Sequence, residues 1–143
     1  MQLERIYALY GSSNSGKTST LNQLISILRE NAEKVVLDEN VGGTDHRAVF
    51  LIKGKYVGVS TQGDCESQVR RHLDVIEPLS NIIFCATRTR GGTCHHVDER
   101  FGNKLTWIQN FGIYNNKKYA FDNSAFIEAS YSSIAKMLFE LVP

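Results

Sequence analysis

Residues Gly11–Thr20 read GSSNSGKTST, and this stretch decides the fold that we expect. The residues before it, Arg5–Tyr10 (RIYALY), form a short apolar and aromatic run, which predicts a buried strand. After it, leucine and isoleucine recur at helical spacing, which predicts an amphipathic helix over Lys17–Asn31. Two glycines, several small polar residues and a lysine therefore stand where a strand passes into a helix.

The segment Gly11–Thr18 fits the spacing G-x-x-x-x-G-K-[ST], which is typical of a loop that binds phosphate. Glycine allows a sharp exit from the strand and a close backbone approach, and the intervening N–H groups can form an anion nest. The helix that follows directs its positive N-terminal end to the same point. We expect Lys17 to reach the β- and γ-phosphates of a nucleotide and the Thr18 hydroxyl to bind Mg²⁺. The predicted nucleotide-binding residues are Gly11, Ser12, Ser13, Asn14, Ser15, Gly16, Lys17, Thr18 and Ser19.

The alternative is a turn of small residues that has this spacing by chance, which average residue frequencies put on the order of 1%. With a strand predicted before it and a helix after it, the motif resembles that of the P-loop NTPase superfamily. The resemblance implies that the chain binds ATP, or another nucleoside triphosphate, together with Mg²⁺.

The remaining pattern alternates strands with helices. Further strands are predicted at Lys34–Leu37, in a hairpin around Gly54, at Ile82–Ala86 and at Leu105–Gln109. Helices are predicted over about 66–79, in a short segment that contains Val97 and Phe101, and at the C-terminal end of the chain. This order favours one α/β domain over residues 1–143, a sandwich around a mostly parallel sheet with one antiparallel hairpin strand.

Three acidic residues, in two segments of the chain, are candidates for the chemistry. P-loop proteins usually carry a metal-binding acid at the end of a strand beside the P-loop strand, and Asp64 follows the predicted strand Tyr56–Ser60. Asp64 would hold Mg²⁺ or sense the γ-phosphate, unless it only caps the helix that follows. Asp38 and Glu39 come just past the strand Lys34–Leu37. In the small P-loop kinases that this layout resembles, a carboxylate there orients or deprotonates the acceptor, and we favour Asp38; the alternative is a solvated loop.

Arg88 and Arg90 follow the strand Ile82–Ala86, in the glycine-rich loop of residues 87–93. Ligands of open α/β sheets bind at such strand ends, and arginine stabilises the charge of a phosphoryl group in transfer. The alternative is a flexible turn with two surface arginines. The pair of motifs S-x-Q-G-D and C-A-T-R-T-R-G-G-T also looks like a family of small bacterial and phage ATP-binding proteins, a resemblance that implies no particular reaction.

The composition limits the other possibilities. The formal net charge of +1 and the absence of a basic stripe disfavour nucleic-acid partners. No apolar run is long enough to span a membrane, and the N-terminal residues lack the pattern of a signal peptide, so we expect a cytoplasmic protein. Three cysteines suggest free thiols. Cys94-His95-His96 lacks regular zinc-ligand spacing, and its role stays open.

The sequence therefore predicts an ATP- and Mg²⁺-binding protein, and it favours a small phosphotransferase with an unidentified small-molecule acceptor. Catalysis would rest on Lys17, Asp38, Arg88 and Arg90, with Thr18 and Asp64 at the metal. The alternatives are a nucleoside triphosphate hydrolase, or a nucleotide-dependent switch or binding module that acts through a protein partner. The oligomeric state and the base preference stay open.

Overall fold

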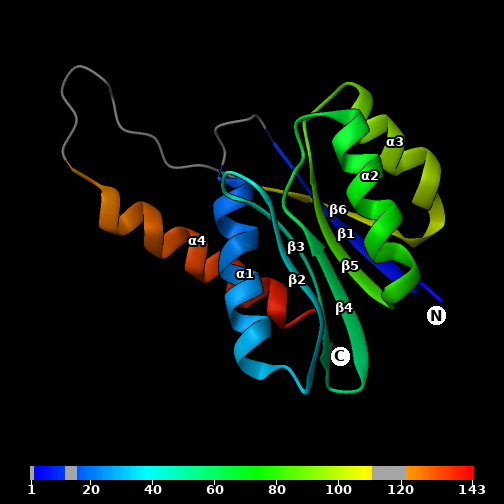
Figure 1. The fold of residues 1–143 in the computed structure, drawn as a ribbon. Helices are drawn as coiled ribbons and strands as arrows, with labels where there is room; N and C mark the ends of the chain where they lie inside the picture. The colour runs from blue at the N-terminus through cyan, green and yellow to red at the C-terminus, as the bar shows by residue number, and fades with distance from the viewer. Residues whose placement is uncertain (1, 12–15, 111–121) are drawn as a thin grey trace.

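The computed structural model describes residues 2–11, 16–110 and 122–143, and its described strands form one six-stranded sheet in the order β2-β3-β4-β5-β1-β6 (Figure 1). The predicted residues Ser12, Ser13, Asn14 and Ser15 lie outside the described ranges. The strands are β1 (Arg5–Tyr10), β2 (Lys34–Gly42), β3 (Asp45–Ile52), β4 (Lys55–Ser60), β5 (Ile82–Thr87) and β6 (Leu105–Gln109). Of these six, β3 alone runs opposite to the others, because it pairs antiparallel with both β2 and β4. The predicted mixed, mostly parallel sheet is confirmed.

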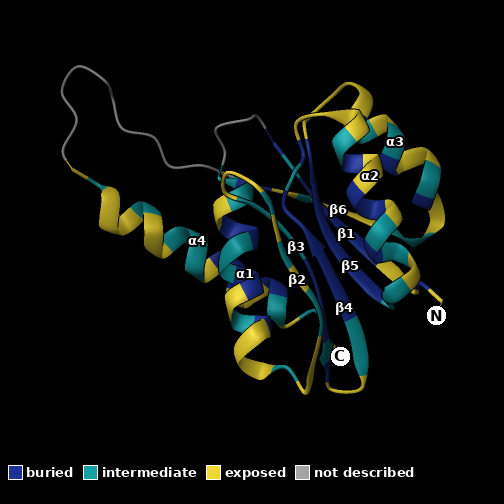
Figure 2. Cartoon of the chain, viewed as in Figure 1, coloured by how far each residue is buried: buried dark blue, intermediate teal, exposed yellow. Residues whose placement is uncertain are grey.

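Helices cover both faces of the sheet. The helix α1 (Lys17–Asn31) and the C-terminal helix α4 (Ser124–Phe139) pack on one face, in a core that contains Leu21, Leu24 and Phe84. The helices α2 (Glu66–Ile76) and α3 (Gly92–Phe101) cover the other face, around Val69, Leu73 and Val97. Short 3₁₀ turns follow α2 at Glu77–Leu79 and α3 at Gly102–Lys104. Figure 2 shows the central strands as the most deeply buried part.

The elements form where local periodicity predicts them. The bounds of β1, α1 and β6 coincide with those expected. The helix predicted over about 66–79 is too long, because α2 ends at Ile76 and the 3₁₀ turn Glu77–Leu79, which contains Pro78, follows it. In α3, Val97 and Phe101 are buried on one face. The β3–β4 turn uses Lys53 at φ 50° and Gly54 at φ 81°, the left-handed backbone that a two-residue hairpin requires.

Two expectations about the strands are wrong. The predicted strand Lys34–Leu37 is too short, because β2 continues to Gly42 as an edge strand paired with β3. Asp38 and Glu39 therefore lie inside β2, opposite Ala48 and Arg47, rather than in a loop after it. Polar residues are tolerated there because an edge strand is only partly covered.

The second correction concerns the strand before Asp64. β4 does not lie beside β1, since β5 lies between them. Every residue of β5 is buried, as expected of a central strand covered on both faces. Because β4, β5, β1 and β6 run parallel, their carboxyl ends meet at one edge of the sheet, and residues 11, 61–64, 88–91 and 110 follow there.

Within the described ranges, no helix combines the length and the apolar character that crossing a membrane requires.

Candidate functional site

Lys17 is the centre of the candidate site. Its side chain is only 5% exposed, although lysine is rarely buried without partners. Its Nζ donates hydrogen bonds to the carbonyl oxygens of Gly11 and Thr87, both at 2.7 Å. These two residues follow and end the neighbouring strands β1 and β5, so the amine bridges two strand ends.

Asp64 supplies the nearest negative charge. One of its carboxylate oxygens lies 3.9 Å from Lys17 Nζ and 3.5 Å from Arg88 Nε. Burial lowers the pKa of Lys17, Arg88 lowers it further, and Asp64 opposes both. The predicted Lys17, Asp64 and Arg88 are thus brought together. The residue at the N-cap position of α2 is Cys65, so Asp64 does not serve as that cap.

A glycine explains how Asp64 reaches Lys17 from a strand that is not adjacent to β1. The loop after β4 crosses the end of β5 at Gly63, where a Cβ would lie within 2.8 Å of the backbone and Cβ of Ala86. Only a residue without a side chain allows this close backbone approach. The carboxylate is therefore positioned by a loop that passes over β5, and not by direct strand pairing.

The start of α1 provides a second group of hydrogen-bond donors. Gly16 is the N-cap residue, has a φ of 81° and makes no side-chain capping bond, and no acidic residue occupies the first helical turn. The first N–H groups of a helix have no partner within the helix, and the helix dipole makes this end positive. An anion would be stabilised at this position.

These groups line one cleft of about 250 Å³. Its lining comes from the start of α1, the loop after β4 and the helix α4, and consists of Gly16, Lys17, Thr18, Ser19, Thr61, Gly63, Asp64 and Tyr131. The ring of Tyr131 lies beside Gly16, so close that a Cβ on Gly16 would meet it at 2.3 Å. We call this space the phosphate cleft.

A polar network joins the loop after β4 to Asp45, the first residue of β3, which directly follows the β2–β3 turn. The Asp45 carboxylate accepts hydrogen bonds from the Thr61 hydroxyl at 2.9 Å and from the Gln62 amide at 3.1 Å. Gln62 in turn accepts the backbone N–H of Asp64 at 2.7 Å. Asp45 therefore holds the loop that carries Asp64.

Other predicted residues lie apart from the cleft. Asp38 accepts two hydrogen bonds from Arg29, at 2.7 and 2.9 Å, and also contacts His46. The Arg29 hydrogen bonds are the main reason that the pKa of Asp38 lies below its usual range. Arg29 is twelve residues beyond Lys17, about 18 Å along the helix, so the structure does not bring Asp38 to Lys17. Its catalytic role stays a prediction.

Arg90 and the Cys94-His95-His96 segment do not join Lys17, Asp64 and Arg88. Arg90 is exposed, and no partner for it is found among the described residues. Cys94 donates to the Gly91 carbonyl at 3.3 Å, and in the described part of the chain no three His, Cys, Asp or Glu side chains gather as metal ligands. A site of Thr18, Asp64 and nucleotide oxygens would not form such a cluster.

Sequence reasoning missed Tyr131 and Thr61 as parts of the cleft. Tyr131 lies on the helical repeat of apolar residues in α4, which indicated only a core position. Thr61 is the variable position of the S-x-Q-G-D motif, so the motif gave it no role of its own. Comparison of the chain with protein-family models, with curated proteins and with solved structures finds no match.

Proposed function

We propose that the chain is a P-loop nucleoside triphosphatase of the kinase type, which binds Mg-ATP or another Mg-nucleotide in the phosphate cleft and transfers the γ-phosphoryl group to a small acceptor. The observation that carries the proposal is the buried amine of Lys17, held between the ends of β1 and β5 with Asp64 beside it. A buried cation at an uncapped helix N-terminus is a good partner for a polyanion.

The residues present fit a magnesium nucleotide. The phosphate cleft offers an ammonium, the N–H groups of α1, a hydroxyl and a carboxylate, and Mg²⁺ prefers such oxygen ligands together with phosphate. Thr18 and Asp64 are the residues that would hold the ion. When bound, Mg²⁺ would neutralise charge on the phosphates. Lys17 would exchange its carbonyl partners for phosphate oxygens.

Arg88 would act on the transferring group. Its guanidinium is half exposed and lies 3.5 Å from Asp64, so it can turn toward a γ-phosphate beside that carboxylate. In the transfer, the bond between the γ-phosphorus and the β-phosphate oxygen breaks. A bond forms to the acceptor oxygen, whose proton leaves to solvent. Arginine stabilises the charge that spreads over the transferring oxygens.

One observation favours a second function, a hydrolase or nucleotide-dependent switch. Asp45 links the loop that carries Asp64 to the β2–β3 turn through Thr61 and Gln62. On the other side of that turn, the Asn22 side chain donates to the Thr44 carbonyl at 2.9 Å. A change at Asp64 on γ-phosphate loss could thus move an exposed turn, which is the kind of element that a protein partner reads.

ADP release from Mg-ATP by the purified chain separates the two functions. The assay is run alone and with a panel of nucleosides, nucleotides and small metabolites, with Lys17→Ala as the negative control. Under the kinase proposal, one compound stimulates release and becomes phosphorylated in equal amount. Slow release that no compound changes would favour the hydrolase or switch, and release by Lys17→Ala at the wild-type rate would contradict both.

A further inference from the structure

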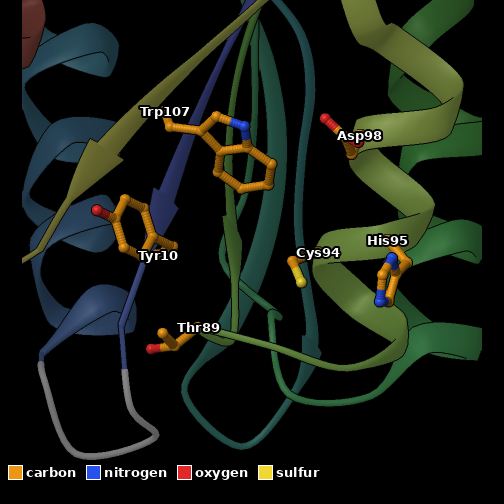
Figure 3. A pocket seen from close by; sticks show the side chains of 6 residues that line it. All are labelled: Tyr10, Thr89, Cys94, His95, Asp98 and Trp107. Atoms are coloured by element: carbon orange, nitrogen blue, oxygen red, sulfur yellow. The ribbon is translucent and has the colours of Figure 1, made fainter.

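A second cavity, of about 430 Å³, lies on the opposite face of the sheet from the phosphate cleft. Its lining comes from the end of β1, the middle of β6, the loop after β5, and α3, and consists of Tyr10, Thr89, Cys94, His95, Asp98 and Trp107 (Figure 3). This volume is in the range of small-molecule sites. We call it the aromatic cavity.

Two aromatic rings form one wall. The rings of Tyr10 and Trp107 meet edge to face, with centroids 5.9 Å apart and planes at 86°. Such a pair leaves ring surface on both residues for a third planar group. Trp107 is 38% exposed, so part of its ring surface is accessible from the cavity.

A carboxylate stands across from the rings. Asp98 projects from α3 toward the side of the cavity where Trp107 lies (Figure 3). Among the described residues, no hydrogen bond or ion pair occupies its carboxylate. An aspartate opposite an aromatic wall would accept hydrogen bonds from the amino or imino edge of a planar heterocycle, as it does in base recognition.

The cavity adjoins the catalytic groups at its other end. Tyr10 directly precedes Gly11, and Thr89 directly follows Arg88. In Figure 3, Thr89 lies at the end of the cavity nearest the loops, away from Trp107 and Asp98. A ligand whose ring lies between Trp107 and Asp98 would therefore extend its other end toward the loop of residues 88–91, which carries Arg88 and Arg90 and which we call the arginine loop.

We propose that the aromatic cavity is the acceptor site, and that the acceptor is a nucleoside-class molecule, with a planar base between Trp107 and Asp98 and a sugar hydroxyl directed toward Thr89 and Arg88. This inference rests on the proposed phosphotransferase function. The other source of a base is the nucleotide donor itself. The position of the phosphate cleft on the α1 and α4 face, beside Tyr131, favours a separate molecule in the aromatic cavity.

The cavity carries its own reporter, because Trp107 is the single tryptophan of the chain. Its emission is followed in nucleotide-free protein while adenosine, guanosine, cytidine or thymidine is added, with correction for absorption by the probe. The same titrations are made with Asp98→Asn and Lys17→Ala. Glu99→Gln, which removes the neighbouring exposed carboxylate of α3, is the matched control.

We expect a saturable change in Trp107 emission with at least one nucleoside. Asp98→Asn should weaken that binding about tenfold, while Glu99→Gln and Lys17→Ala should bind as the wild type does. The proposal would be overturned if no nucleoside of the panel gave a saturable change in Trp107 emission, or if Asp98→Asn bound the nucleoside as tightly as the wild type does. A further result would also overturn it: Mg-ATP changes the Trp107 emission, nucleosides reverse this change by competition, and Lys17→Ala abolishes it. The base of the donor nucleotide would then occupy the cavity.

Failure of the phosphotransferase function gives a different result. If Mg-ATP binds wild type and Lys17→Ala equally, the phosphate cleft is not a nucleotide site, whatever Trp107 reports. If Mg-ATP binding depends on Lys17 while Trp107 stays silent, only the acceptor site is refuted.

Discussion

At the scale of single residues, the proposed chemistry depends on three charged side chains that lie together at the carboxyl end of the sheet. Lys17 is fixed by two carbonyl oxygens, whereas Asp64 and Arg88 are about half exposed. An exposed ion pair of this kind contributes little to folding stability. Asp64 and Arg88 can therefore exchange partners when a phosphate enters. We expect substitution of either residue to affect turnover more than folding stability.

Replacing Arg88 with alanine should lower kcat about a hundredfold and leave nucleotide affinity within a few-fold, because the guanidinium acts on charge that develops in transfer. Steady-state kinetics of ADP release, with nucleotide affinity measured separately, would test this. Arg70→Ala, which removes an exposed arginine paired with Glu66 in α2, should retain wild-type rates. An equal loss of affinity and turnover in Arg88→Ala would mean that Arg88 only binds the ground state.

At the scale of elements, the crossing of the β4–α2 loop over β5 brings the carboxylate to the amine. The contact is tight at Gly63, where the backbone of Ala86 leaves no room for a Cβ. Backbone atoms of a central strand cannot move aside as the end of a side chain can. The position of Asp64 therefore depends on a glycine that carries no chemistry itself.

Gly63→Ala should destabilise the fold by about 1–3 kcal/mol, as overpacking does, and weaken nucleotide binding by displacing Asp64. Gly92→Ala is the matched control, since a Cβ there would meet side-chain atoms of Glu66 and no strand backbone: the carboxylate can rotate away, and the Glu66 Cβ, 3.1 Å away, needs to shift only slightly. Urea unfolding of the two variants and nucleotide titrations provide the measurements. Equal stability of both variants would show that the loop does not pass over β5 as described.

The packing of α2 on β3 should make the free energy of unfolding depend on pH. Burial lowers the pKa of His72, the cations Arg47 and Arg71 lower it further, and Asp45 and Glu39 partly offset this. The ordinary pKa of histidine is about 6.5, so below this pH the unfolded chain takes up the proton more readily than the folded one. Stability contributed by neutral His72 is therefore present at higher pH, and is lost as pH falls from about 6.5 toward the folded pKa.

The free energy of unfolding should consequently fall between about pH 7.5 and about pH 5.5, and His72→Gln should flatten that fall. Urea denaturation at the two pH values, for wild type and variant, measures the difference. A variant that loses as much stability as the wild type would contradict the assignment of this pH dependence to His72.

Sequence predicted the elements well, because helix and strand periods are local properties. Pairing is not local, which explains the errors. The polar run Asp38–Asn40 reads as a loop until β3 is seen to pair with it, and no local signal places β5 between β4 and β1. In the site, the motif residues Lys17, Asp64 and Arg88 converge as expected, while Tyr131 enters through the packing of α4 on α1.

At the scale of the whole molecule, the phosphate cleft and the aromatic cavity lie on opposite faces of the sheet, at its carboxyl end. The phosphate cleft opens on the face of α1 and α4, and the aromatic cavity opens on the face of α3. The arginine loop after β5 lies between them, with Arg88 toward one and Thr89 toward the other. Under the proposed function, this arrangement would place a donor and an acceptor on two sides of the same group of charges.

The central claim is that the phosphate cleft binds a nucleotide through Lys17, and calorimetric titration of the purified chain with Mg-ATP tests it most directly. Wild type and Lys136→Ala, which removes an exposed lysine of α4, should bind with equal affinity, whereas Lys17→Ala should show at least a hundredfold weaker binding while its thermal unfolding stays cooperative. Equal affinity of Lys17→Ala and wild type would contradict the account, as would a wild-type chain that binds no nucleoside triphosphate.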